Sequence, residues 1–334
     1  MNHSSAPRTG ATRRLIHWSM LFLLLAGLLS ACQPAAQAPA EDSAPTEIRL
    51  VMLPIIDALP FYVATQQDYF AAQNIRVTYI PTGSAAERDQ LIAAGQADGM
   101  INDLVSVALY NKTAVQVQTV RFAATASASS PMFRVLAARD SGLATAADLA
   151  GVPVGMSQGT VIDYVTARLL EKEGLAPDQI ESIAVPKLPD RLALLGSGEL
   201  QAATLPEPFG TIALQDGATL IVDDSKYPEY GNSVISFRKA FIDAHPQAVK
   251  GFLLAVEQAI ADINKDPDAW RGLLSEYKLV PAALQESYPI PAFPPASVPT
   301  QAQWQDVTAW AVSRGLIPED LPYDESVTDA YLPE

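Results

Sequence analysis

The chain has 334 residues, a formal net charge of −15 at pH 7 and a single cysteine. So acidic a chain does not suit nucleic acid, which requires a basic face, and one cysteine excludes a disulfide framework or a thiolate metal site. Because His3 and His17 lie in the first 31 residues, only His245 is left for the remainder, too few for a Ser-His-Asp triad or a multi-histidine metal centre. We therefore expect no catalytic residue, no metal and no cofactor.

The first 31 residues have the layout of a secretory signal peptide. Three arginines precede an apolar run, 15–31, whose fully apolar part is shorter than the roughly 20 residues that span a bilayer. An uncleaved membrane anchor is therefore disfavoured. The stretch Leu29-Ser30-Ala31-Cys32 fits the cleavage pattern of bacterial lipoproteins. We predict that Cys32 becomes the first mature residue and carries the lipid, including palmitate.

Residues 32–46 are predicted to be a lipidated cysteine followed by a flexible tether rich in Pro, Ala and Gln. A lipid in front of such a tether places the folded part at the extracytoplasmic face of the cell membrane without spanning it. Removing residues 1–31 also removes three arginines, which makes the formal charge of the mature chain about −18.

Strands and helices alternate in the next part of the chain. A capping box is expected at Ser84 and Glu87, where a serine is followed three residues later by a glutamate. The alternation predicts parallel strands covered by helices. The strands are expected at 47–53, 75–80 and 98–103, and the helices at 60–73 and 85–94.

The same order of elements recurs further along, although the two regions share no convincing sequence repeat. Gly174 stands where the glycine after a helix C-terminus is expected. The strands are predicted at 151–156, 180–186, 202–206 and 219–224, and the helices at 159–174, 189–200 and 207–218.

The remainder is predicted to be mainly helical. An amphipathic helix is expected over 246–264 and another over 301–317, while the proline-rich residues 281–299 should lie over the surface. The segment 234–242 is expected to return to the first region. These elements indicate an α/β protein with a ligand cleft between two lobes. We assign 47–130 plus 232–334 to the first lobe and 131–231 to the second.

Four stretches resemble a known family: LPFYVATQQDYFAAQNIRV, LIAAGQADGMINDL, GVPVGMSQGTVIDY and GELQAATLPEPFGTIALQDGA. In this order they are similar to periplasmic solute-binding proteins of ABC importers, in the branch of nitrate, sulfonate, taurine and thiamine-pyrimidine-precursor binders. Within the branch the chain looks closest to vitamin receptors, including riboflavin-binding lipoproteins of riboflavin importers. The resemblance implies a type II periplasmic-binding-protein fold that closes around its ligand, with a permease and its ATPase as partners.

Loops at predicted strand ends supply the candidate ligand-binding residues. Most have an ordinary alternative role: the aspartates, Ser157 and Thr160 are good helix caps, and Glu207 is a favourable residue at a helix start. Ser157 and Thr160 also precede a helix whose free N–H groups suit a ligand oxygen. The candidates are Asp57, Tyr62, Asn102, Asp103, Ser157, Thr160, Tyr164, Glu207 and Phe209.

These candidates are acceptors and aromatics, with no Arg or Lys among them. An anion requires positive charge or many converging N–H donors, whereas a neutral heteroaromatic suits carboxylates and stacked rings. The sequence therefore favours a vitamin or its precursor, with riboflavin slightly ahead of the thiamine pyrimidine precursor. The alternative is a receptor for nitrate, sulfonate or taurine.

Two other classes of function remain open. An enzyme on the same fold is less favoured, because the related pyrimidine synthase needs cysteines inside the folded chain and Cys32 lies before it. A related dehydratase activity has no support beyond the shared fold. A sensor or docking lipoprotein that works without a permease is the other alternative.

Overall fold

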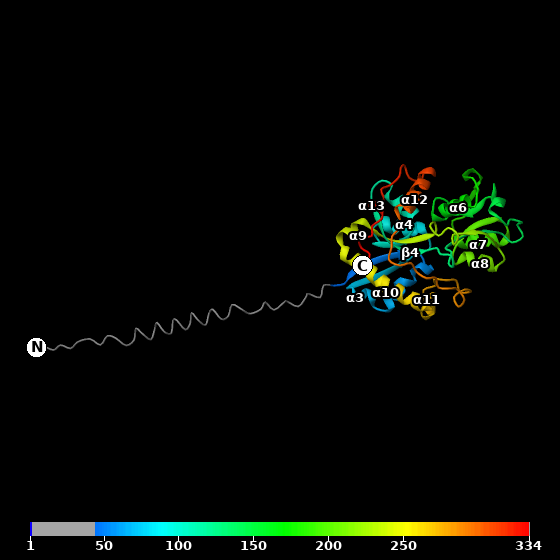
Figure 1. Cartoon of the computed structure of the whole chain (residues 1–334). Coiled ribbons are helices and arrows are strands. Elements are labelled where there is room, and N and C mark those ends of the chain that lie inside the picture. Colours follow the sequence, from blue (N-terminus) through cyan, green and yellow to red (C-terminus); the bar gives the residue numbers. More distant parts are fainter. Residues whose placement is uncertain (2–43, 334) are drawn as a thin grey trace. The chain divides into compact units, whose positions relative to one another are not determined.

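The computed structural model describes residue 1 and residues 44–333, and the chain from Pro45 onward forms one compact unit. In Figure 1 this unit has two lobes, one holding the blue, cyan, yellow and red parts of the chain and the other the green part. The predicted signal peptide, Cys32 and nearly all of the tether lie outside the described residues. Within the described part, no helix combines the length and the apolar character needed to cross a membrane.

The first lobe is built on a five-stranded sheet in the order β2-β1-β3-β10-β4. The first three strands of the chain are parallel, as expected, but β10 runs antiparallel between β3 and β4. The prediction of parallel strands therefore covers only part of the sheet, because the chain re-enters this lobe from the opposite end. The strands are β1 (Thr46–Met52), β2 (Ile75–Pro81), β3 (Gly99–Asn102), β4 (Val117–Thr125) and β10 (Asn232–Arg238).

The second lobe contains another five-stranded sheet, in the order β7-β6-β8-β5-β9. Here β6, β7 and β8 are parallel, and β5 runs antiparallel to both β8 and β9. Residues 126–132 and 224–231 are the two crossovers that join the sheets. The strands are β5 (Phe133–Ala137), β6 (Val154–Met156), β7 (Ser182–Ala184), β8 (Ala202–Pro206) and β9 (Thr219–Asp223).

Helices follow most of the parallel strands. The first lobe has η1 (Ile56–Ala58), α2 (Leu59–Gln66), α3 (Tyr69–Ala72), α4 (Ala85–Ala93) and α5 (Leu104–Asn111). The second has η2 (Ala146–Leu149), α6 (Val161–Lys172), η3 (Pro177–Gln179), α7 (Leu188–Ser197) and α8 (Phe209–Gln215). The C-terminal part has α9 (Lys239–Ala244), α10 (Pro246–Lys265), η4 (Pro267–Trp270), α11 (Arg271–Glu276), α12 (Gln301–Ser313) and α13 (Tyr323–Ser326).

Aromatic residues from distant parts of the chain form the core of the first lobe around Phe252 of α10. Its ring stacks on Phe61 and Phe70, at centroid distances of 5.7 and 5.1 Å, and meets the edge of Phe237 at 5.3 Å. The predicted apolar face of α10 is buried throughout. This packing joins α2, α3 and α10 to the return strand β10, so the C-terminal helices complete the first lobe.

Two local details of the structure differ from the sequence prediction. Ser84 caps α4 by accepting the N–H of Glu87, but the Glu87 carboxylate accepts from Gly83 and not from Ser84, so only half of the capping box forms. The proline-rich residues 281–299 contain no helix or strand, yet Tyr288 and Phe293 are buried in the first core. Residues 282–287 form hydrogen-bonded turns, and the aromatic side chains of the segment still turn inward.

Candidate functional site

The carboxyl ends of the parallel strands carry most of the predicted binding residues. In the first lobe, Asp57 lies in η1 after β1 and is buried, and Ser233 at the start of β10 donates a hydrogen bond of 2.6 Å to its carboxylate. Burial raises the pKa of Asp57, while the bond from Ser233 lowers it by a smaller amount. Asp57 therefore sits where the returning crossover rejoins the first sheet.

Asn102 and Asp103 end strand β3. Asn102 is buried and accepts a hydrogen bond of 2.8 Å from Ser236, so it links two neighbouring strands. Asp103 is the N-cap of α5, where it accepts the N–H of Ser106 at 2.8 Å. Burial raises its pKa, and the nearby Arg88 lowers it by a smaller amount. The predicted capping role of Asp103 is therefore observed.

In the second lobe, Ser157 follows β6 and meets a buried arginine that sequence reasoning missed. Nη2 of Arg191 donates a hydrogen bond of 2.6 Å to Ser157 Oγ. The other bonds of its guanidinium go to the backbone oxygens of Val185, Thr204 and Pro186. Burial lowers the pKa of Arg191 to about 10, so the group is charged at neutral pH. Among residues 44–333, no carboxylate forms an ion pair with it.

Side chains of the protein itself already bind some of the N–H groups at the start of α6. Thr160 is the N-cap, and its Oγ1 accepts the N–H of Ile162. The N–H of Gly159 is donated to Asp163 Oδ2 at 2.9 Å, and the other oxygen of Asp163 accepts from Arg314. The helix start therefore has fewer donors for a ligand than the sequence alone indicates.

Glu207 ends strand β8 and is already bound by neighbouring donors. Its carboxylate accepts from Arg134 of β5 and, at 2.6 Å, from Thr211 of α8. Arg134 also contacts Asp223, so one cation serves two carboxylates. Phe209 begins α8, is half-buried and packs against the core of the second lobe. A ligand at Glu207 would have to share its oxygens with these donors.

Tyr62 does not present a free aromatic face. Its ring lies 3.7 Å from that of Tyr277 in a stacked arrangement and 4.9 Å from the tilted ring of Tyr79. Burial raises its pKa to about 12. The stacking surface that the sequence suggested for a ligand is filled by residues of the first lobe itself.

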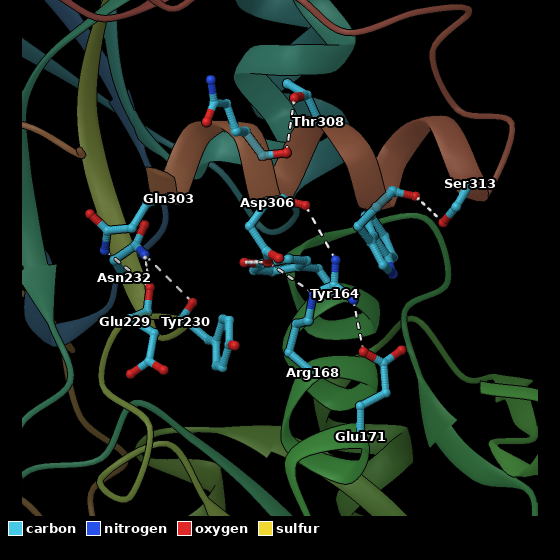
Figure 2. Close-up of polar contacts among 12 residues, drawn as sticks. Tyr164, Arg168, Glu171, Glu229, Tyr230, Asn232, Gln303, Asp306, Thr308 and Ser313 are labelled. Atoms are coloured by element: carbon cyan, nitrogen blue, oxygen red, sulfur yellow. Dashed lines mark hydrogen bonds and ion pairs between the residues drawn. The ribbon is translucent and has the colours of Figure 1, made fainter. Parts of the chain in front are cut away.

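Tyr164 is likewise engaged within the protein, at the contact between α6 and α12 in Figure 2. Its hydroxyl donates a hydrogen bond of 2.7 Å to Asp306, and Arg168 forms an ion pair with the same carboxylate at 2.8 Å. The rings of Trp310 and Tyr230 meet Tyr164 edge-on at 5.5 and 6.0 Å. This residue therefore connects the second lobe to the C-terminal helix α12.

The two cations at these strand ends change the electrostatic picture of the candidate site. Arg134 lies in strand β5 and Arg191 in helix α7, whereas the candidates were sought in loops. Neither arginine belongs to a sequence motif from which its contacts could be predicted. Although none of the predicted candidates is an Arg or Lys, arginines thus contact two of them, Glu207 and Ser157. Nothing in the described part of the chain groups three or more His, Cys, Asp or Glu side chains into a metal site.

Comparison with known proteins gives the family. The model of the NMT1/THI5-like family matches residues 56–270, well over half of the chain. The chain belongs to this family. A sequence search of curated proteins found no match.

Solved structures share its fold at low sequence identity. The alkanesulfonate-binding protein SsuA of Xanthomonas axonopodis pv. citri, bound to MOPS, is 18% identical with a TM-score of 0.70, over 86% of this chain and 99% of that one. The aliphatic sulphonate-binding protein SsuA of Escherichia coli is 17% identical with a TM-score of 0.70, over 83% and 95%. The nitrate-binding protein NrtA of Synechocystis PCC 6803 is 15% identical with a TM-score of 0.66, over 86% and 87%. The fold is the two-lobed type II fold of periplasmic binding proteins, as predicted.

Proposed function

We propose that the protein is the solute-binding receptor of an ABC importer and captures a small oxyanion of the sulfonate or nitrate type between its lobes. Its family and the binding proteins that share its fold support the receptor role. Those proteins are named for sulfonates and nitrate, so the oxyanion class takes precedence over the vitamins favoured by the sequence alone.

The observation that carries this proposal is the charge of Arg191. The side chain is fully buried at the carboxyl edge of the second sheet, and no acidic residue in the described part of the chain is bonded to it. A buried cation without a counter-charge costs several kcal/mol. A ligand oxyanion beside Ser157 would supply that counter-charge. Ser157 accepts a hydrogen bond from Arg191, and its hydroxyl would in turn donate one to the ligand. Such a local cation can attract an anion in spite of the acidic surface.

The aromatic residues point in the same direction. A riboflavin-like ligand needs an open ring face on which to stack. Tyr62 is covered by Tyr277 and Tyr79, and Tyr164 is enclosed by Trp310, Tyr230 and α12. Neither residue offers such a surface in this arrangement.

Calorimetric titration of the soluble domain tests the ligand class. Ethanesulfonate, taurine, nitrate, riboflavin and the thiamine pyrimidine precursor should be compared under one set of conditions. We expect at least one oxyanion to bind, and a ligand at about 100 times its dissociation constant to add roughly 2.7 kcal/mol to stability. Binding of the vitamins with none of the anions would refute the oxyanion class. Recovery of the bound compound unchanged after incubation is expected for a receptor that is not an enzyme.

Membrane attachment is a separate part of the proposal. It rests on the lipoprotein pattern ending at Cys32, with the tether behind it. We expect Cys32→Ala to abolish lipidation and release the protein from the cell membrane, while a domain beginning near Thr46 binds as the wild type does. A lipid still attached to the Cys32→Ala protein would contradict this assignment.

A further inference from the structure

Helix α12 is fixed to the first lobe on both of its sides in the sequence. Before the helix, the backbone oxygen of Ser297 accepts the N–H of Phe122 in β4 at 2.9 Å. After the helix, the N–H of Thr328 is donated to the backbone oxygen of Thr119 in the same strand, also at 2.9 Å. The position of α12 therefore follows the position of the first sheet.

Helix α6 is instead fixed to the second lobe. Its Thr166 is completely buried, and the hydroxyl donates a hydrogen bond of 2.7 Å to Thr204 of β8. The helix also begins directly after residues 157–160, the turn that follows β6. Because α6 belongs to one lobe and α12 to the other, each contact between these two helices is a contact between the lobes.

Two polar contacts join the helices, and Figure 2 shows the first of them. Asp306 of α12 accepts hydrogen bonds from Tyr164 at 2.7 Å and from Arg168 at 2.8 Å. Arg314, at the C-terminal end of α12, donates one of 2.8 Å to Asp163 in the first turn of α6. Since Asp306 and Arg314 lie about two turns apart along α12, the two contacts together resist rotation of one helix against the other.

Asp163 connects the second contact to the turn before α6. Its side chain is buried; one oxygen accepts from Arg314, and the other accepts the N–H of Gly159 at 2.9 Å. Gly159 has a φ of 71°, which favours glycine, and a Cβ there would lie 3.4 Å from Leu316. Arg314 and Leu316, both from the end of α12, thus reach the turn that contains Ser157.

The polar contacts between the helices are partly open to water. The Asp306 and Arg314 side chains are 37% and 42% exposed, so water can replace their partners when the helices separate. Ion pairs of this exposure contribute little to the stability of the whole fold. Their free energy is nevertheless large enough to shift the populations of two arrangements of the lobes.

We propose that the contact between α12 and α6 is an interlobe latch that fixes the angle between the two lobes. Within it, Arg314 acts through Asp163 as a positioning residue for the turn 157–160. This second role rests on the proposed function, in which Ser157 binds the oxyanion. When the latch is broken, the lobes sample more angles and only a fraction of the molecules presents the turn as binding requires, so the apparent affinity falls by that fraction.

The angle between the lobes can be measured without any ligand. The chain has one cysteine, so Cys32→Ala leaves it free for two spin labels, at Lys250→Cys in α10 and Asp178→Cys in η3, both exposed. Pulsed electron paramagnetic resonance then gives the distribution of distances between the lobes. We expect Asp306→Asn combined with Arg314→Met to broaden or displace this distribution.

A matched control breaks an ion pair inside the first lobe. Lys239 and Asp243 pair within α9, and Lys239→Met combined with Asp243→Asn changes the net charge by the same amount, zero. This control should keep the wild-type distribution. The single Asp306→Asn variant should shift the distances in the same direction by less, and it serves if the double variant fails to fold.

Calorimetric titration with ethanesulfonate, taurine and nitrate tests the positioning role. Arg314→Met should weaken binding of the oxyanion that wild type binds by about threefold or more, because fewer molecules hold the turn in place. The Lys239→Met variant removes the same charge elsewhere and should bind as the wild type does.

The two measurements separate the latch from the proposed function. An unchanged distance distribution in folded Asp306→Asn and double-variant proteins would overturn the latch. Unchanged oxyanion affinity in folded Arg314→Met would overturn the positioning role, even where the lobes move. If wild type binds none of the three anions, the oxyanion function and the positioning role fail together, and the distances alone decide the latch.

Discussion

Arg121 in the first lobe and Arg191 in the second have the same side chain and are both fully buried, but their charges are balanced differently. Arg121 of β4 forms an ion pair with Glu257 of α10 and bonds the backbone oxygens of Phe122 and Pro294. Among the residues that the structure describes, Arg191 of α7 bonds only backbone oxygens and the hydroxyl of Ser157. The charge of Arg121 is therefore balanced by a carboxylate, whereas Arg191 has no carboxylate partner within residues 44–333.

In the proposed function, this difference distinguishes a structural cation, Arg121, from a ligand-binding one, Arg191. Arg121 of β4 bonds both α10 and the C-terminal segment that contains Pro294, so its guanidinium stabilises the first lobe. Arg191 instead bonds Ser157, which directly follows strand β6. Perturbed, unbalanced charges of this kind are concentrated at functional sites. The following predictions test that contrast, in order of expected effect.

The largest effect is expected on removing the counter-charge of Arg121. Glu257→Gln leaves this buried guanidinium without a carboxylate, as Arg191 is now, and should lower the free energy of unfolding by about 3 kcal/mol. Urea unfolding measures the change, with the exposed Glu286→Gln as a control expected to have little effect. Equal stability of both variants would show that the carboxylate of Glu257 does not matter and would remove the contrast.

A buried carboxyl group gives the converse case. Asp224 begins one crossover and accepts the N–H groups of Met132 and Phe133, where the other crossover joins β5. Its second oxygen has no hydrogen-bond partner among the described residues. Burial, with a smaller contribution from the adjacent Asp223, raises its pKa to about 7. The folded protein then holds a proton that the unfolded chain has lost, so its contribution to stability is present at low pH and disappears as the pH rises through 7.

Asp224→Asn tests this pH dependence. Between pH 5 and pH 8 the wild type should lose about 2–3 kcal/mol of unfolding free energy through this group. The amide introduced by the substitution keeps an acceptor for the two N–H groups and cannot titrate, so the variant should lack that loss. Identical pH slopes for wild type and Asp224→Asn would mean that Asp224 is ionised throughout this range.

The third prediction concerns binding by Arg191. Arg191→Met removes the buried charge and should weaken binding of the oxyanion by about 1.5–3 kcal/mol, roughly ten- to a hundredfold. The exposed Arg139→Met keeps the same change in net charge and should bind as the wild type does. Calorimetry gives both affinities. An unchanged affinity in a folded Arg191→Met protein would class Arg191 with Arg121 as structural.

The smallest effect is expected at the contact between α6 and α12, where the charge is open to water. The Asp306 side chain is 37% exposed and pairs with Arg168. Solvent screening limits such pairs, so Asp306→Asn should cost less than about 1 kcal/mol of unfolding free energy. Urea unfolding beside Glu257→Gln compares the two directly. A loss as large as that of Glu257→Gln would show that burial is not what separates these sites.

Local rules were enough for many elements of the fold. The apolar spacing of 246–264 predicted the buried face of α10, and Ser84 and Gly174 mark helix ends as expected. These features depend on neighbours within a few residues, which is the range over which helix periodicity and capping act. The direction of β10 was not accessible in this way, because it depends on which end of the sheet the chain re-enters.

Candidate residues at strand ends were found for the same local reason, but their partners were not. Asp57, Asn102 and Ser157 stand where parallel strands end, as the alternation of elements predicted. Whether Tyr62 has a free face depends on Tyr277, which is more than two hundred residues away in the sequence. The sequence thus predicted where the candidate residues lie, but not which side chains contact them.

By itself, the sequence determined the α/β architecture, the family resemblance and the acidic character of the chain, since these follow from composition and short-range periodicity. Only the tertiary structure decided that Arg191 bonds Ser157 with no carboxylate of residues 44–333 paired to it, and that Tyr62 is covered by Tyr277. Charge balance and burial depend on which distant side chains share a space, and folding of the whole chain brings those side chains together.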